Sequence, residues 1–250
     1  MFELETSRID SFRNMIKALS VIVEEGAFAF GEDQMRLLAM DPSHVAMVDF
    51  ELPKESFDKY LCDAEKRVSM NVREFLKFLD RIEKDEYVKI SLDEEKMRLG
   101  IQCSRGGHVR QFLMPLLEPS DEDVPSPKIF FKAKARMLAR SLRHVVRDAS
   151  LVSEHVKFEI GKDNIRVRAE GDLGSAMSTW EKGAEDILDL RAEESAGATF
   201  TLSYLEDIIS AASVSSEIVS LELSTDMPVK LDFELTQGRL VYYLAPCIGV

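Results

Sequence analysis

The sequence predicts an α+β protein built from two similar halves, because one pattern of a helix followed by strands occurs twice. In the first half, the pattern comprises residues 69–79, 88–92 and 112–116. It recurs about 130 residues later, in residues 199–209, 219–223 and 243–247. An acidic segment with three prolines separates the halves. A duplicated unit of this kind predicts a pseudo-symmetric molecule.

Composition and cysteine usage favour an ordinary globular protein that works inside the cell. The chain has 250 residues, of which 45% are hydrophobic and 31% charged, and no apolar run approaches the roughly 18 residues that span a bilayer. The first residues carry no basic flank or apolar stretch typical of a secretion signal. Cys62, Cys103 and Cys247 are odd in number and widely spaced. We therefore expect reduced thiols, with neither disulfides nor a zinc site.

In the first half, apolar residues at helical spacing predict a helix over 10–19, and a second helix is expected over 72–82. Alternating apolar and polar residues predict an antiparallel meander. Its expected strands are 27–30, 35–40, 45–52, 88–92, 97–103 and 109–116. Residues 93–95 and 105–107 are expected to form hairpin turns.

Three prolines and four acidic residues within 118–127 exclude both a helix and a central strand, so this segment is predicted to be a connector. The expected domains are therefore 1–117 and 128–250. In the second, we expect a strand over 128–133, a basic helix over 135–148, and hairpin turns at 161–164 and 171–174. Two helices and eight or nine strands in each half predict helices lining one face of a sheet.

The most informative local pattern is a row of arginines at steps of four, three and four, which places them on one helix face. These residues are Arg136, Arg140, Arg143 and Arg147, and the expected apolar face comprises Leu138, Leu142 and Val145. A run of charges is usually a solvated face. Here hardly any acid lies between the arginines, and that absence favours an external anion.

Two other predicted helices carry basic residues, whereas the fourth does not. The first has Arg13 and Lys17, and the second has Arg73, Lys77, Arg81 and Lys84. The fourth carries Ser203, Glu206, Asp207, Ser210 and Ser213. A net charge of −13 opposes binding to nucleic acid unless the basic residues share one face, and these helices offer such a face.

Catalytic signatures are missing from the sequence. No motif of a serine hydrolase, a zinc protease or a phosphate-binding loop occurs. The histidines lie in separate predicted elements without the spacing of metal ligands: His44, His108, His144 and His155. Residues 40–45 and 244–248 are less polar than loops and chain ends usually are. They are interpreted either as edge packing or as a groove for a hydrophobic peptide anchor.

Several strings in the right order resemble the PCNA-type DNA sliding clamps, most closely the archaeal members. They are residues 1–3, 38–45, 57–63, 148–153, 157–158, 169–171 and 242–246. The resemblance implies two domains of the DNA clamp fold, with antiparallel sheets outside and four helices lining the inner face of a trimeric ring. It implies a processivity factor without enzymatic activity or cofactor, which encircles duplex DNA and, if archaeal, is cytoplasmic and associated with the nucleoid.

The resemblance also implies roles for individual positions. Those matching the family's DNA-facing lining are Arg13, Lys17, Lys77, Arg81, Arg140, Arg143 and Arg147. Polymerase, clamp loader, flap endonuclease and DNA ligase would bind through short peptides in a groove formed by Met40, His44, Val45, Met47, Val124, Pro125, Ile129, Pro228, Tyr243 and Ala245. Subunits would join edge strands near 109–116 and 175–182, through Val109, Gln111, Leu113, Met177, Thr179 and Trp180.

Two alternatives stay open at this point. The chain is either self-sufficient or one subunit of a heterotrimeric clamp, because edge complementarity cannot be judged from one sequence. An α+β enzyme or ligand-binding protein is the third hypothesis, and the lack of any nucleophile, base or metal constellation counts against it.

Overall fold

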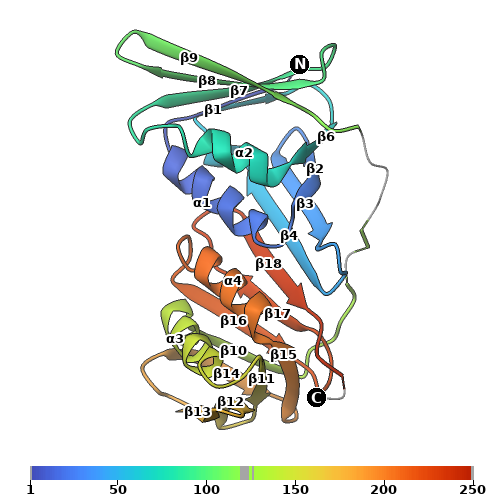
Figure 1. Ribbon diagram of the computed structural model, residues 1–250, viewed down its shortest axis with the longest axis vertical. Coiled ribbons are helices and arrows are strands. Elements are labelled where there is room, and N and C mark those ends of the chain that lie inside the picture. The colour runs from blue at the N-terminus through green and yellow to red at the C-terminus, as the bar shows by residue number, and fades with distance from the viewer. Residues whose placement is uncertain (1, 119–123, 126, 249–250) are drawn as a thin grey trace. The chain divides into compact units, whose positions relative to one another are not determined.

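The structure, a computed structural model, describes residues 2–118, 124–125 and 127–248. It divides into two compact units (Figure 1). The first unit comprises Met1–Pro42, Val48–Pro125 and Thr236–Arg239, and the second comprises Ser43–Met47, Ser126–Leu235 and Leu240–Val250. Each unit thus takes a short segment from the other half of the chain. Residues 119–123 and 126 of the predicted connector lie outside the described residues.

The first half contains nine strands, two α-helices and one short 3₁₀ helix, Lys54–Ser56. The helices are α1 (Ile9–Ser20) and α2 (Val72–Leu79). The strands are β1 (Phe2–Thr6), β2 (Glu25–Phe30), β3 (Gln34–Met40), β4 (Ala46–Pro53), β5 (Lys59–Cys62), β6 (Lys66–Asn71), β7 (Tyr87–Asp93), β8 (Arg98–Arg105) and β9 (His108–Pro115).

Within the described residues, the second half likewise contains nine strands and two α-helices, but no 3₁₀ helix. Its helices are α3 (Ala139–Ser150) and α4 (Leu202–Ala212), each of which begins 130 residues after its counterpart α1 or α2. The strands are β10 (Ala133–Leu138), β11 (His155–Ile160), β12 (Asn164–Gly171), β13 (Gly174–Glu181), β14 (Ile187–Ala192), β15 (Ala196–Thr201), β16 (Ile218–Leu223), β17 (Val229–Phe233) and β18 (Arg239–Leu244).

The strand orders confirm the predicted duplication. In the first half the strands follow the orders β5-β1-β7-β8-β9 and β4-β3-β2-β6, and in the second half β14-β10-β16-β17-β18 and β13-β12-β11-β15. The two pairs of orders become identical when each strand is replaced by its counterpart nine strands later. Neighbouring strands pair antiparallel, as in β8 with β9 and β12 with β13.

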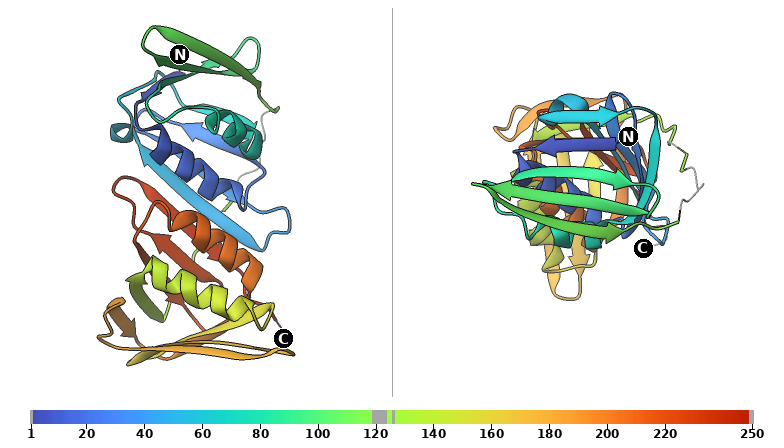
Figure 2. Two further views of the ribbon diagram at one scale, coloured as in Figure 1. Left: turned by 60° about the vertical axis from the view of Figure 1, so that its left-hand side comes forward. Right: turned by 90° about the horizontal axis from the view of Figure 1, so that it is seen from above.

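In each half the two helices pack side by side and cover the strands, as Figure 1 shows for α1 with α2. Figure 2 shows α3 and α4 arranged in the same way. The apolar face of α1 buries Ile9, Phe12, Ile16 and Leu19. Strands supply the other side of the core through alternate residues, for example Met35, Leu37 and Ala39 of β3.

Two predicted helix boundaries are wrong. Helix α2 ends at Leu79 instead of residue 82, because the next amides, of Arg81 and Ile82, bond to carbonyls only three residues back. Helix α3 begins at Ala139 instead of residue 135. The preceding residues form β10, which pairs with both β14 and β16, so the expected strand over 128–133 is also displaced.

These shifts change the expected faces of α3. Arg136 lies on β10 and forms an ion pair with Glu234, so it is not part of the arginine row. The buried face of the helix consists of Ala139, Leu142, Val146 and Ala149, whereas Val145 is only half-buried. No helix among the described residues is long and apolar enough to cross a membrane.

Candidate nucleic-acid interface

Helix α3 carries three of the predicted DNA-facing residues along one side. Arg140 and Arg147 are exposed, and within the described ranges no carboxylate forms an ion pair with either. Arg143 is half-buried, and its Nη1 donates a hydrogen bond to Ser213 Oγ at 3.4 Å. Its Nε is buried and lacks a hydrogen-bond partner in the part of the chain that the structure describes. The row therefore offers two free guanidinium groups and one that is held against α4.

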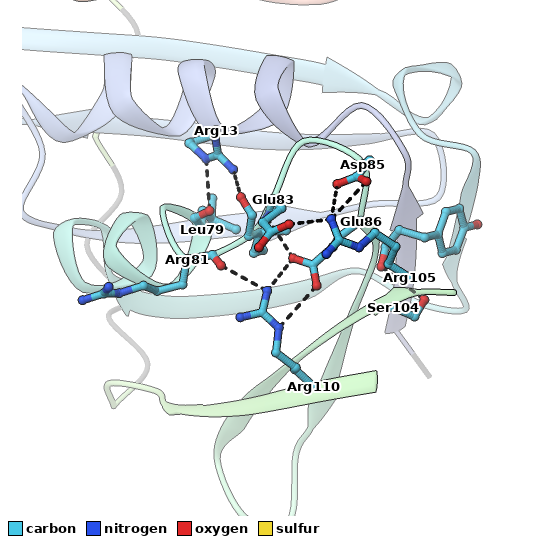
Figure 3. A network of polar contacts seen from close by, with 11 residues as sticks. Arg13, Leu79, Arg81, Glu83, Asp85, Glu86, Ser104, Arg105 and Arg110 are labelled. Atoms are coloured by element: carbon cyan, nitrogen blue, oxygen red, sulfur yellow. Dashed lines mark hydrogen bonds and ion pairs between the residues drawn. The ribbon is translucent and has the colours of Figure 1, made fainter. Parts of the chain in front are cut away.

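Arg13 of α1 is engaged by its own unit, as Figure 3 shows. Its Nε donates to the carbonyl of Leu79 at 3.0 Å, and Nη2 donates to the carbonyl of Ile82. Nη1 bonds Asp10 at 2.9 Å, and only 21% of the side chain is exposed. Arg13 thus occupies the carbonyls at the end of α2, where the helix dipole is negative. Its predicted role on DNA competes with this capping role.

The remaining predicted residues of the first unit are exposed. Lys17 lies on the outer side of α1, and among the described residues no carboxylate pairs with it. Lys77 is 70% exposed and forms an i,i+3 ion pair with Glu74 at 2.6 Å, a surface contact worth little in solution. Arg81 follows the end of α2, and its side chain extends away from the network drawn in Figure 3. All three are available to an external anion.

A network of arginines and acids holds the turn after α2, next to Arg81. Arg110 of β9 donates to the carbonyl of Arg81 at 3.1 Å and pairs with buried Glu86. The backbone N–H of Glu83 and the guanidinium of Arg110 lower the pKa of Glu86. Arg105 pairs with Glu83 and with Asp85. The turn that carries Arg81 is therefore tied to the edge strand β9.

Helix α4 contributes no basic side chain, because its sequence from Leu202 to Ala212 contains neither lysine nor arginine. Among the polar residues considered for it, Ser203 and Asp207 are exposed, whereas Ser210 is half-buried. Ser213 caps the helix and accepts the bond from Arg143. Of the two helices of the second unit, only α3 therefore presents a positive face.

The residues predicted for the peptide groove divide between the units. Met40, Val124 and Pro125 belong to the first unit, and the other seven belong to the second. Within the second unit, the amide of Ala245 bonds the carbonyl of Val45 at 2.9 Å. Pairing of β17 with β18 places Pro228 beside the same segment.

The side chains of this set differ in accessibility. His44 is exposed and has a φ of 57°, a left-handed conformation in the turn before β4. Val45, Ile129 and Tyr243 are half-buried, whereas Met47 is only 5% exposed. Met47 can therefore support a groove but offers little surface to a ligand.

The residues predicted for the subunit interface lie on two strands at the edges of their sheets. Strand β9 ends one sheet order and β13 ends another. Val109, Gln111 and Leu113 alternate along β9 and are exposed on one face. Met177 and Thr179 are exposed on β13, whereas Trp180 points to the opposite face and is half-buried. Edge strands with exposed apolar residues are open to pairing with another chain.

Within residues 2–118, 124–125 and 127–248, no three His, Cys, Asp or Glu side chains gather in a way that could hold a metal ion. The described residues thus present two features: positively charged side chains on helices, and strands at the open edges of sheets. This arrangement suits binding to a polyanion and to other chains.

Comparisons with known proteins cover nearly the whole chain. The family model described as "Proliferating cell nuclear antigen, N-terminal domain" matches residues 1–116, and the corresponding C-terminal domain model matches residues 126–248. A "DNA polymerase sliding clamp 1" of Pyrobaculum aerophilum is 34% identical over 236 residues, which is 94% of each chain. The "DNA polymerase sliding clamp" of Nitrosopumilus maritimus is 29% identical, over 98% of each chain.

The fold has a solved counterpart. A crystal structure of PCNA from Thermococcus kodakaraensis matches with a TM-score of 0.90, covering 99% of this chain and 100% of that one, at 24% sequence identity. The predicted fold class and the predicted resemblance are confirmed. The chain belongs to the PCNA family of DNA sliding clamps, which are processivity factors without catalytic activity.

Proposed function

We propose that three copies of this chain close into a ring around duplex DNA and hold replication and repair enzymes on it, with α3 as the main contact to the phosphates. The observation that carries this proposal is the pair of exposed arginines on α3, Arg140 and Arg147, neither of which forms an ion pair among the described residues. Phosphate contacts of this kind position DNA without reading its sequence. The chain has a net charge of −13, so its other surfaces are mostly acidic and repel nucleic acid.

The test is a double charge reversal, Arg140→Glu with Arg147→Glu, assayed by the length of DNA that a clamp-dependent polymerase synthesises in one binding event. We expect processivity to fall to the level without clamp, while the native mass is unchanged. Lys96→Glu with Lys157→Glu is the matched control, because it makes the same charge change at exposed strand and turn positions. Equal processivity of the two variants would refute the assignment of α3.

Ring closure would join the β9 edge of one subunit to the β13 edge of the next, a head-to-tail association that closes when the rotation permits. The exposed Leu113 and Met177, 51% and 68% exposed, support this pairing. Leu113→Asp should convert a trimer into monomers in light scattering, whereas Leu173→Asp, at a hairpin tip with an 84% exposed side chain, should not. A wild-type monomer or dimer would instead indicate that another clamp chain completes the ring.

Polymerase, clamp loader, flap endonuclease and ligase would dock through short peptides with hydrophobic anchors, using the residues of the predicted groove. Ile129 offers a sharp test because its neighbour Phe130 is 90% exposed and outside the predicted set. Ile129→Asp should weaken binding of such a peptide about tenfold, a loss expected for one buried apolar contact. Phe130→Asp should leave the affinity unchanged in a fluorescence titration.

A further inference from the structure

A hollow of about 590 Å³ lies in the second unit, apart from α3 and α4. The start of β10, the β11–β12 turn, the residue after β13 and the end of β14 line it. Its volume falls within the range of small-molecule sites in proteins. Ala133 and Leu190 in its wall are buried, so the bottom is fixed by the core of the unit.

The lining is strongly basic although the chain as a whole is acidic. Five cations face two acids: the cations are Lys132, Lys134, Lys162, Lys182 and Arg191, and the acids are Asp163 and Glu193. The charge of the lining is thus opposite in sign to the net charge of the chain, which is −13. A concave surface lined by one sign of charge concentrates ions of the opposite sign.

Three of the cations have carboxylate partners, and two do not. Lys132 pairs with Glu193 at 3.2 Å, Lys134 with Glu222 at 3.1 Å, and Arg191 with Asp189 at 2.9 Å. For Lys162 and Lys182, no carboxylate lies within ion-pair distance in the part of the chain that the structure describes. These two ammonium groups are therefore free to bind an anion without breaking an existing pair.

The backbone holds these two lysines at neighbouring positions. The amide of Lys182 donates to the carbonyl of Asp163 at 2.7 Å, which ties the end of β13 to the β11–β12 turn. The amide of Gly161 bonds the carbonyl of Asn164 at 2.8 Å and closes the turn that carries Lys162. The site is thus built by main-chain bonds that do not depend on the lysine side chains.

We infer that this hollow binds a compact oligophosphate, such as a chain of two or three phosphates. Four of the five cations are lysines, which bind phosphate as point charges. The cations also come from four separate segments around a hollow. An extended acidic peptide would need a row of partners along its length instead.

The test is isothermal titration of the full-length protein with tripolyphosphate at low salt. Lys162→Gln with Lys182→Gln should lower the affinity on the order of a hundredfold, about tenfold for each lost charged contact. Lys84→Gln with Lys96→Gln is the matched control, with the same charge change on exposed residues of the first unit. It should change the affinity less than about twofold.

Two further measurements are needed. One tests whether tripolyphosphate binds this hollow and not α3, and the other tests which kind of molecule supplies the phosphates. Arg140→Gln with Arg147→Gln should leave tripolyphosphate binding intact; loss in this variant, with none in the lysine variant, would overturn the inference. If the ligand is the end of a nucleic-acid strand, a single-stranded oligonucleotide with a 5′-triphosphate should compete with tripolyphosphate for the hollow. If the ligand is a free oligophosphate, only tripolyphosphate should bind. A poly-glutamate peptide that binds as tightly, with the same lysine dependence, would refute the phosphate assignment.

Discussion

Arg13 and Arg143 stand 130 residues apart at the same place in α1 and α3, yet the two halves use them differently. Arg13 reaches two carbonyls at the end of α2 and is mostly buried. Arg143 reaches only the Ser213 hydroxyl, and its Nε has no partner among the described residues. The cause is the length of the second helix, because α2 ends at Leu79, whereas α4 continues to Ala212.

The comparison shows that the two halves share a fold although equivalent side chains, such as Arg13 and Arg143, form different contacts. In the longer helix, the carbonyl of Ile209, the counterpart of Leu79, accepts the amide of Ser213. The arginine of α3 therefore lacks the carbonyl partners that Arg13 has. The basic residues of the helices are divided between α1 and α2 in the first half, whereas in the second half all of them lie on α3.

The largest expected difference concerns the stability of the two helix pairs. Arg13→Ala should destabilise α2 by about 3 kcal/mol, since two charged hydrogen bonds to buried carbonyls are lost. Arg143→Ala should change the stability of α4 by less than about 1 kcal/mol. Hydrogen exchange of the amides in α2 and α4 measures both effects. Arg13→Lys keeps the positive charge but removes the forked guanidinium, so it should destabilise α2 about as much as Arg13→Ala. Wild-type stability of α2 in this variant would rule out capping by the guanidinium.

The second prediction uses Glu3 of β1, which is more deeply buried than Glu222, the carboxylate that Lys134 and Lys230 hold in the β10 sheet. Lys59 and Lys89 lie 2.5 Å from Glu3 and lower its pKa from 4.5 to about 2. The counterpart of Glu3 in the repeat is Ala133. Because the folded-state pKa is depressed, the stabilisation is complete above about pH 4.5 and is lost as the pH falls towards 2.

Acid should therefore open the β1 sheet of the first unit before the β10 sheet of the second. Hydrogen exchange followed from pH 5 to pH 2.5, with rates corrected for pH, would show the order. Glu3→Gln should remove about 2 kcal/mol of stability at neutral pH and abolish most of this pH dependence. Simultaneous opening of both sheets in the wild type would contradict the role of Glu3.

A third comparison sets Arg147 of α3 against its counterpart, Lys17 of α1. Arg147→Glu should shorten processive synthesis on the order of tenfold at moderate salt, because Arg140 is then the only exposed arginine left on α3 and α4 has no basic residue. Lys17→Glu should have a weaker effect, about threefold, since Lys77 and Arg81 remain. Primer extension over a series of salt concentrations measures both effects. A larger loss of processivity in Lys17→Glu than in Arg147→Glu would contradict the proposal that DNA binding in the second half depends mainly on α3.

The smallest expected effect concerns helix capping. Asn71 Oδ1 accepts the amide of Glu74 at 2.9 Å and caps α2, whereas its counterpart Thr201 makes no such bond to α4. Asn71→Ala should cost about 1 kcal/mol, and Thr201→Ala should cost a few tenths of that. Thermal unfolding followed by circular dichroism would compare them. Equal losses would indicate that the longer helix needs its cap as much as the shorter one.

Much of the fold could be predicted from local patterns. The helix over 10–19 and the turns at 161–164 and 171–174 match α1 and the hairpins of β11–β13. At the β8–β9 hairpin, Gly106 and Gly107 have φ values of 54° and 86°, which explains why this turn is readable from sequence. Short strands without strong alternation, such as β5 and β14, were missed because propensity over four to six residues is a weak signal.

The candidate interface was readable only in part. Arg140 and Arg147 have the exposure that helical spacing predicts. Arg136 was misassigned because a basic residue in a central strand has the same local spacing as one in a helix. The decisive factor, pairing of β10 with β14 and β16, involves residues 50 or more positions away, the nearest pair being Met137 with Ile187.

By itself, the sequence determined the duplicated α+β architecture, the apolar face of α1 and the concentration of arginine on α3. These features depend on the order of residues within one or two turns of helix or one hairpin. Only the tertiary structure decided that Arg13 caps α2, that Arg143 does not cap α4, and that lysines from separate turns surround one hollow. Each of these contacts joins residues distant in the chain, as Arg13 and Ile82 are, and depends on where a helix ends or a strand pairs.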